Sequence, residues 1–187
     1  MAILSVPDKG LVFREENEIK VYLEKIGIRY ERWDADEMRV SPEASEEEIL
    51  RAYEPEIEKL KAEGGYVKAD VINILPTTPG LEEMLNKFNK EHWHDEDEVR
   101  FIVKGNGLFH IAPKGSDVVS IQMQAGDLIC VPRGTLHWFN LCEDKTVRAI
   151  RLFQDPSGWT PHYTNSHVDE KYQPLCFGTF YIPNTAT

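Results

Sequence analysis

The sequence predicts a mainly β protein in which a small antiparallel barrel or sandwich follows a group of helices packed outside it. From residue 92 onward, short β-prone runs alternate with turn segments such as GNG, AGD and PRGT, a spacing typical of antiparallel sandwiches and barrels. Before residue 91, apolar residues recur mainly at helical spacing. The 187 residues fit one domain: about 1–90 form an N-terminal elaboration, 91–155 the barrel core and 156–187 a wrapping C-terminal segment.

Three helices are expected in the N-terminal part, and the first and third have an apolar stripe on one face. The second has the capping-box pattern of Ser45 and Glu48, and Pro55 should kink or divide it. Thr78 followed by Pro79 should start the third. The expected helices cover residues 15–26, 45–64 and 78–88, and the strands between them cover 28–35 and 66–74.

Six β-prone runs are expected to build the barrel. Asn106-Gly107 is typical of a two-residue hairpin turn, which would pair Val103 with His110 on the face away from Glu98. His110 is therefore interpreted as structural. His162 and His167, in the C-terminal coil, are interpreted as surface or hydrogen-bonded histidines. The runs are residues 98–104, 108–112, 118–123, 128–132, 136–141 and 146–153.

Composition indicates a small-molecule partner. With 21 Lys+Arg against 32 Asp+Glu, the chain lacks the basic surface that nucleic acid or an anionic membrane requires. Its N-terminus lacks the regions of a signal peptide and no apolar run approaches bilayer length, so we expect a soluble cytoplasmic protein. Three cysteines without a C-x-x-C pair predict reduced thiols and no disulfide. No coiled coil or long apolar edge strand calls for a partner, so a monomer is expected.

Four side chains in two clusters form a candidate metal site. His92 and His94 are two residues apart on an extended segment, so their imidazoles point the same way. Glu98 follows an acidic turn at 95–97 and can complete a set of two histidines and one carboxylate. His137, just after the PRG turn, can add a third imidazole. Four such ligands in an octahedral field leave two adjacent positions open, which is a catalytic layout.

The spacing around these ligands resembles the two motifs of the cupin superfamily. The first reads H-x-H-x3-E-x6-G and ends at Gly105, and the second reads G-x5-P-x-G-x2-H and begins at Gly126. The resemblance implies a cupin double-stranded β-helix that gathers these residues around one metal. Asn86 replaces the glycine that usually begins the first motif, and Asn140 follows His137 by three residues where four is usual. Neither departure touches a ligand.

Arg100 is expected to place a permanent positive charge beside the metal. On a regular strand it shares a face with Glu98. The alternative is that both side chains face solvent, because the opposite Val-Phe-Val face is the more apolar one. The N-terminal helices could cover that apolar face, however, and a solvated Glu98 would break an otherwise complete ligand set. We therefore expect Arg100 to face the metal and an anionic substrate.

The run EHWHDEDEVRF resembles the signature of the acireductone dioxygenase family, including an arginine two residues after the metal-binding glutamate. The segments ILPTTPGLEEML, VPRGTLHWF and RLFQDPSGWTPHYT extend the resemblance over most of the chain. It implies that His92, His94, Glu98 and His137 bind one Fe(II) or Ni(II) ion per chain, and that Arg100 promotes formation of the substrate dianion. The implied reaction cleaves acireductone, 1,2-dihydroxy-3-keto-5-methylthiopentene, with O2 in methionine salvage.

This resemblance also implies products and further site residues. The iron form yields formate and 4-methylthio-2-oxobutanoate, whereas the nickel form yields formate, carbon monoxide and 3-methylthiopropanoate. Phe88, Phe139 and Trp159 are candidates for a pocket around the methylthio tail, or else plain core residues. Glu91 and Asp97 are candidates for metal loading or for transmitting metal-dependent changes, or else belong to an acidic turn surface.

Two other function classes remain open. One is another cupin dioxygenase or a sugar-phosphate isomerase, although an isomerase needs phosphate-binding cations and the acidic chain offers few beyond Arg100. The other is a non-catalytic cupin that binds a metal or small ligand, which the lack of a DNA-binding segment or second cupin repeat disfavours. A metal-dependent dioxygenase is the leading hypothesis.

Overall fold

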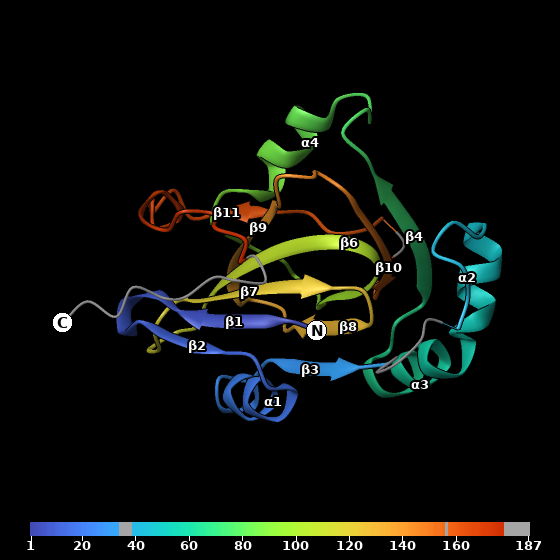
Figure 1. Ribbon diagram of the computed structural model, residues 1–187, viewed down its shortest axis with the longest axis horizontal. Coiled ribbons are helices and arrows are strands. Elements are labelled where there is room, and N and C mark those ends of the chain that lie inside the picture. Colours follow the sequence, from blue (N-terminus) through green and yellow to red (C-terminus); the bar gives the residue numbers. More distant parts are fainter. Residues whose placement is uncertain (34–38, 156, 178–187) are drawn as a thin grey trace.

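The computed structural model describes residues 1–33, 39–155 and 157–177 (Figure 1). Antiparallel strands form one sheet that closes into a barrel, and helices lie outside it, as the sequence predicts. The N-terminal elements are β1 (Ile3–Val6), a 3-10 turn (Pro7–Lys9), β2 (Leu11–Phe13), α1 (Glu16–Lys25), β3 (Arg29–Arg32), α2 (Glu46–Ala52), α3 (Glu54–Gly64), β4 (Lys68–Ile74) and α4 (Leu81–Phe88). The remaining elements are β5 (His92–Trp93), β6 (Glu98–Ala112), β7 (Val119–Gln124), β8 (Asp127–Val131), β9 (Leu136–Leu141), β10 (Val147–Phe153), β11 (His162–Tyr163) and a 3-10 turn (Asp169–Lys171).

The predicted capping box opens α2. The Ser45 hydroxyl accepts a hydrogen bond from the Glu48 amide at 3.3 Å, and the Glu48 carboxylate accepts one from the Ser45 amide at 2.9 Å. Pro55 lies in the first turn of α3, so it divides the two helices as expected. The strand predicted at 28–35 is observed as β3, and its predicted last two positions lie outside the described residues.

The third helix begins later than predicted. Thr78 does not open it: its hydroxyl accepts a hydrogen bond from the Leu75 amide at 2.8 Å and closes a turn before the helix. Gly80, with φ +69°, then redirects the chain, and α4 begins at Leu81. A local hydrogen bond to the preceding backbone therefore outcompetes helix capping at Thr78.

Helices α2 and α3 cover the outer face of β6, beside β4 and β10 (Figure 1). Val99, Phe101 and Val103 pack there against apolar side chains of both helices. This burial confirms that the Val-Phe-Val face is covered by N-terminal helices and that Glu98 and Arg100 point the other way, into the barrel. The alternative of a solvent-facing Glu98 and Arg100 is wrong, since they are 2% and 4% exposed.

The hairpin predicted at Asn106-Gly107 is wrong, because β6 runs through it as one 15-residue strand. A bulge interrupts the strand instead: Arg148 pairs with Lys104 while Ala149 pairs with Ile102. The extra residue shifts the inside-outside alternation by one. Gly105, at φ +79°, is needed there because a Cβ would lie 2.0 Å from the Thr146 carbonyl oxygen.

The bulge also decides the position of His110. It pairs with Ser120 on β7 and Trp138 on β9, not with Val103. The shifted alternation places His110 on the outer face of the sheet, while its neighbour Phe109 points inward, 5.5 Å from the Arg100 guanidinium. The histidine is therefore away from Glu98 as predicted, for a different reason.

The N-terminal segment Ile3–Val6 is a strand that the sequence pattern did not single out. It pairs with β7, and Leu4 and Val6 are fully buried. β11 was also missed. It lies in the C-terminal segment that was expected to be coil, and it pairs with β5. No helix in the described ranges is long and apolar enough to cross a membrane.

The prediction that all three cysteines are reduced thiols is wrong. Cys142, after β9, forms a disulfide with Cys176 near the end of the described chain, and only Cys130 is free. The pair is 34 positions apart, and no short motif marks it because the fold alone brings the C-terminal segment back to β9.

Replacing both Cys142 and Cys176 by serine should lower the free energy of unfolding by up to about 4 kcal/mol, because the bond restricts the unfolded chain over a 34-residue separation. Urea denaturation of the oxidised protein and the double variant measures the difference. Adding a reductant should destabilise the wild type and leave the double variant unchanged. Equal midpoints for the reduced and oxidised wild type would contradict the disulfide.

His110 should make stability depend on pH. Burial lowers its pKa to about 4, against 6.5 in the unfolded chain. Between these two pH values the His110 side chain is protonated in the unfolded state but not in the folded state. Its contribution to the free energy of unfolding is therefore fully present above pH 6.5 and is lost as the pH falls toward 4. When the pH is lowered from about 7.5 to about 4.5, the free energy of unfolding should fall in both proteins. The fall should be about 2 to 3 kcal/mol smaller in His110→Phe than in the wild type.

The measurement is urea denaturation of metal-free protein at both pH values. His167→Asn is the control, because His167 is an exposed histidine paired with Glu170. A pH dependence that is identical in His110→Phe and the wild type would show that His110 does not remain neutral in the fold.

Candidate metal centre

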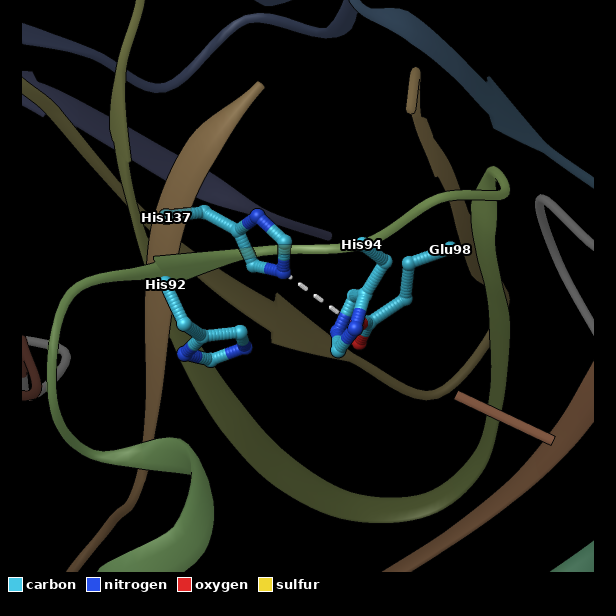
Figure 2. Close-up of side chains that lie close together, drawn as sticks. All are labelled: His92, His94, Glu98 and His137. Atoms are coloured by element: carbon cyan, nitrogen blue, oxygen red, sulfur yellow. Dashed lines mark hydrogen bonds and ion pairs between the residues drawn. The ribbon is translucent and has the colours of Figure 1, made fainter. Parts of the chain in front are cut away.

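The four predicted ligands converge inside the barrel from three strands and one loop (Figure 2). His92 lies on β5 directly opposite His137 on β9. His94 lies just after β5, and Glu98 is the first residue of β6. The acidic turn at 95–97 joins them as predicted, and all four residues are 2% exposed or less.

The ligand atoms are close enough to share one ion. One nitrogen or oxygen from each of the four residues lies within 4.8 Å of the others. The Nε2 atoms of His94 and His137 lie 3.1 and 3.2 Å from the same oxygen, Glu98 Oε2. Figure 2 shows the imidazoles and the carboxylate turned toward this common point.

Backbone carbonyl groups fix the orientation of all three imidazoles. Nδ1 of His92 lies 2.6 Å from the Lys90 carbonyl oxygen, and Nδ1 of His137 lies 2.8 Å from that of Thr135. Nδ1 of His94 likewise lies 2.8 Å from the carbonyl oxygen of Thr160. A carbonyl only accepts, so each Nδ1 carries the proton and each Nε2 offers its lone pair to the centre.

This proton arrangement fits a divalent metal. With protons on Nδ1, the Nε2 lone pairs of His94 and His137 face the lone pairs of Glu98, and a cation is needed between them. Nε2 of His92 is buried with no hydrogen-bond partner among the described residues. Three imidazoles and one carboxylate are the ligands that first-row transition metals prefer. The four predicted residues therefore form a buried group that could hold a metal ion.

Electrostatics keep Glu98 and His92 in metal-binding protonation states. Burial alone would raise the pKa of Glu98, but Arg100, His137 and His94 outweigh it and hold that pKa well below its usual range. Burial, followed by the charge of His137, lowers the pKa of His92 to about 4. A carboxylate and a neutral imidazole are the forms that bind metals.

Arg100 lies beside the metal centre, as predicted. Its Nε is 2.8 Å from Glu98 Oε1, and its guanidinium stacks on the Phe139 ring at 4.5 Å. Its terminal amino groups form no hydrogen bond or ion pair with the part of the chain that the structure describes. A buried guanidinium with unused donors is suited to bind an anion.

The three predicted pocket aromatics all lie against the centre. Phe88 lies 5.9 Å from the His92 ring, and Trp159 lies 6.1 Å from the His94 ring. Phe139 lies under the Arg100 guanidinium. Sequence reasoning missed Tyr163, whose ring lies 6.2 Å from that of His92. No local pattern marks it, because β11 reaches the site only through pairing with β5.

The carboxylates of Glu91 and Asp97 form hydrogen bonds to other segments of the chain and do not simply belong to an acidic surface. Glu91 is 4% exposed, and its Oε1 accepts hydrogen bonds from the Thr164 and Ser166 hydroxyls at 2.5 Å each. Asp97 accepts one from the Tyr66 hydroxyl at 3.0 Å, and another at 3.0 Å from the backbone amide of residue 133, in the turn before β9. Each carboxylate thus joins a ligand segment to another part of the fold.

A jelly-roll barrel that gathers three histidines and one glutamate in its interior defines a metal-binding cupin. The family model described as the ARD/ARD' family matches residues 10–161. The chain belongs to that family.

The chain is similar to acireductone dioxygenases over most of its own length and theirs. The chain is 43% identical over 157 residues to the acireductone dioxygenase of Picosynechococcus sp., covering 84% of this chain and 89% of that protein. It is 41% identical over 182 residues to the enzyme of Stenotrophomonas maltophilia, covering 97% and 94%. The solved structure of acireductone dioxygenase from Bacillus anthracis, with a cadmium ion in its active centre, matches with a TM-score of 0.79 and 36% identity, covering 87% and 98%.

Proposed function

We propose that this chain is a metal-dependent dioxygenase that cleaves acireductone with O2 in methionine salvage. Family membership and the names of its relatives support the reaction. The single observation that carries the proposal is the buried set of three carbonyl-anchored imidazoles and Glu98, with the guanidinium of Arg100 beside it. The geometry combines a metal centre with a fixed positive charge, as chemistry on an anionic chelating substrate requires.

We infer that His92, His94, Glu98 and His137 hold one Fe(II) or Ni(II) ion. When bound, the metal supplies a Lewis acid with open positions for a chelating substrate and oxygen chemistry. The cadmium ion in the active centre of the Bacillus anthracis relative supports a divalent ion at this place. The metal present would decide whether the products are those of the iron form or those of the nickel form.

Arg100 would bind the substrate and promote its second ionisation. An enediol that loses both protons carries two negative charges, and a nearby permanent cation lowers the cost of that ionisation. The free amino groups of Arg100 supply the charge and the donors, while Glu98 and the ring of Phe139 keep the guanidinium in place. The low-polarity surroundings strengthen this interaction, because Arg100 is only 4% exposed.

The aromatic side chains around the centre would take the apolar end of the substrate. Phe88, Phe139 and Trp159 are proposed to contact the methylthio tail, because all three lie beside a metal ligand or Arg100. Glu91 would assist metal loading through its contact with the C-terminal segment, and Asp97 would transmit metal-dependent changes toward α3 and β9.

The test of the proposed function is turnover of acireductone under oxygen by protein loaded separately with iron and with nickel. Substrate loss should accelerate with either metal, and carbon monoxide should appear only with nickel. Heat-denatured protein with the same metal is the control for reaction in solution. No acceleration with either metal would refute the proposal.

The expected monomer, the cytoplasmic location and the absence of nucleic-acid or membrane partners stay predictions. Disulfides persist mainly in oxidising compartments, so the bond between Cys142 and Cys176 is the observation that stands most directly against a cytoplasmic location.

A further inference from the structure

A second polar site lies on the outer face of the barrel, beneath the C-terminal segment. A cavity of about 270 Å³ opens there between β1, β7 and residues 171–177. Ser5, Ser120 and His110 line it from three neighbouring strands. Because Ser5 pairs with Ser120 and Ser120 with His110, the three side chains form one row across the sheet.

This row is buried but has no internal hydrogen bonds. The exposed fractions are 6% for Ser5, 4% for Ser120 and 1% for His110. His110 Nδ1 is fully enclosed without a hydrogen-bond partner among the described residues, whereas the two serine hydroxyls are not enclosed and line the cavity. Buried polar groups are normally paired, and an unpaired one costs roughly 1 to 3 kcal/mol. The unpaired His110 nitrogen therefore marks the row as incomplete within the described residues, and the two serine hydroxyls beside it are available to a molecule in the cavity.

The row can donate three hydrogen bonds to one acceptor group. Each serine hydroxyl is a donor, and a neutral imidazole donates from one of its nitrogens. Burial lowers the pKa of His110 to about 4, so the ring is neutral near pH 7. Stacking on Trp138, with ring centres 4.9 Å apart, holds its plane in place.

The rest of the cavity combines one positive charge with an apolar wall. Lys171 is the only charged side chain among its described lining residues, and it belongs to no ion pair in the described chain. Apolar residues of β2 and the C-terminal segment also line the cavity, among them Val12, Leu175 and Phe177. Donors, a cation and an apolar wall together suit a carboxylate with an aliphatic tail.

The cavity is held by fixed elements on both sides. The disulfide to Cys142 fixes Cys176, and the Phe177 amide donates a 2.6 Å hydrogen bond to Gln122 on β7. The Tyr172 hydroxyl donates a 2.6 Å hydrogen bond to Asp8. A volume of about 270 Å³ exceeds the roughly 150 Å³ that holds one benzene molecule, but is at the lower limit of drug-sized pockets. The ligand must therefore be small.

We propose that this cavity binds a short-chain aliphatic carboxylate, with its carboxylate on Ser5, Ser120, His110 and Lys171. The site is separate from the metal centre, because His110 and Trp138 lie on the outer face of the sheet while His137 points inward. It does not depend on the proposed dioxygenase reaction.

Isothermal titration of metal-loaded protein with sodium hexanoate tests the proposal. We expect saturable binding that His110→Phe and Ser120→Ala weaken about tenfold or more, because each removes a hydrogen bond to a charged group. Lys171→Ala should weaken it as well, whereas Lys114→Ala, an exposed lysine outside the cavity, should not. 1-Hexanol, which has the same chain without the charge, should bind much more weakly.

A carboxylate could also bind the metal, so the titration is repeated with His94→Ala, which lacks a ligand at the centre. Hexanoate binding that survives in His94→Ala and is lost in His110→Phe supports the outer site. Binding that is lost in His94→Ala and kept in His110→Phe overturns it, as does no saturable heat or equal binding of 1-hexanol. Circular dichroism and thermal midpoints identify any variant that has failed to fold, and a folded Ser120→Ala then decides.

Discussion

His94→Ala should abolish tight metal binding, and with it the stabilisation that the metal gives to the fold. The Nε2 of His94 lies 3.1 Å from Glu98 Oε2, and its Nδ1 is anchored to the Thr160 carbonyl, so no other side chain can take its place. Loss of an outer hydrogen-bond partner alone weakens metal binding 10 to 100-fold, so loss of the ligand should cost at least about 100-fold.

The measurement is the thermal midpoint of stripped protein with and without added Ni(II), together with metal content after dialysis. At a free metal concentration about 100 times the Kd, the wild type should gain about 2.7 kcal/mol and the variant almost nothing. His167→Ala is the control, because His167 lies on the surface and contacts Glu170. Equal metal content in His94→Ala and the wild type would show that His94 is not a ligand.

The metal centre could be predicted from the sequence because its ligands follow a local rule. Two histidines separated by one residue on an extended segment must point the same way, and their spacing to Glu98 fits an acidic turn. His137 is 39 residues from Glu98, and only the glycine and proline spacing around it indicated the fold that joins them. The backbone carbonyl groups that accept from each Nδ1 correspond to no sequence pattern, because any residue can supply a carbonyl.

Three of the errors in the predicted fold share a physical cause. Asn106-Gly107 has the composition of a hairpin turn, but pairing with β7 and β9 on both sides keeps the strand extended through it. The bulge near Lys104 then exchanges the inward-facing and outward-facing positions in the rest of β6, and no local sequence pattern indicates this exchange. The disulfide between Cys142 and Cys176 likewise depends on where the C-terminal segment returns. In each of these cases a contact between residues far apart in the sequence decided the outcome.

Arg100→Ala should keep the metal and lose turnover by about 100 to 1,000-fold, the usual cost of removing one group that stabilises developing negative charge. The substrate would have to lose its second proton without a neighbouring cation, so the remaining activity should rise with pH over a higher range than in the wild type. Measurements of kcat/KM against pH, together with metal content, separate this effect from loss of the ion.

The conservative variant Arg100→Lys distinguishes charge from shape. A lysine keeps the positive charge but lacks the planar fork, and it loses the broad stacking surface that rests on Phe139 at 4.5 Å. Turnover between that of Arg100→Ala and the wild type, with a pH profile close to the wild type, would assign the main contribution to charge. Arg51→Ala, on the exposed face of α2, is the matched control and should change neither quantity.

Full turnover in Arg100→Ala would contradict the role of the guanidinium. Loss of metal from the same variant would mean instead that Arg100 acts by keeping Glu98 ionised, since that cation is the largest influence opposing burial at the carboxylate.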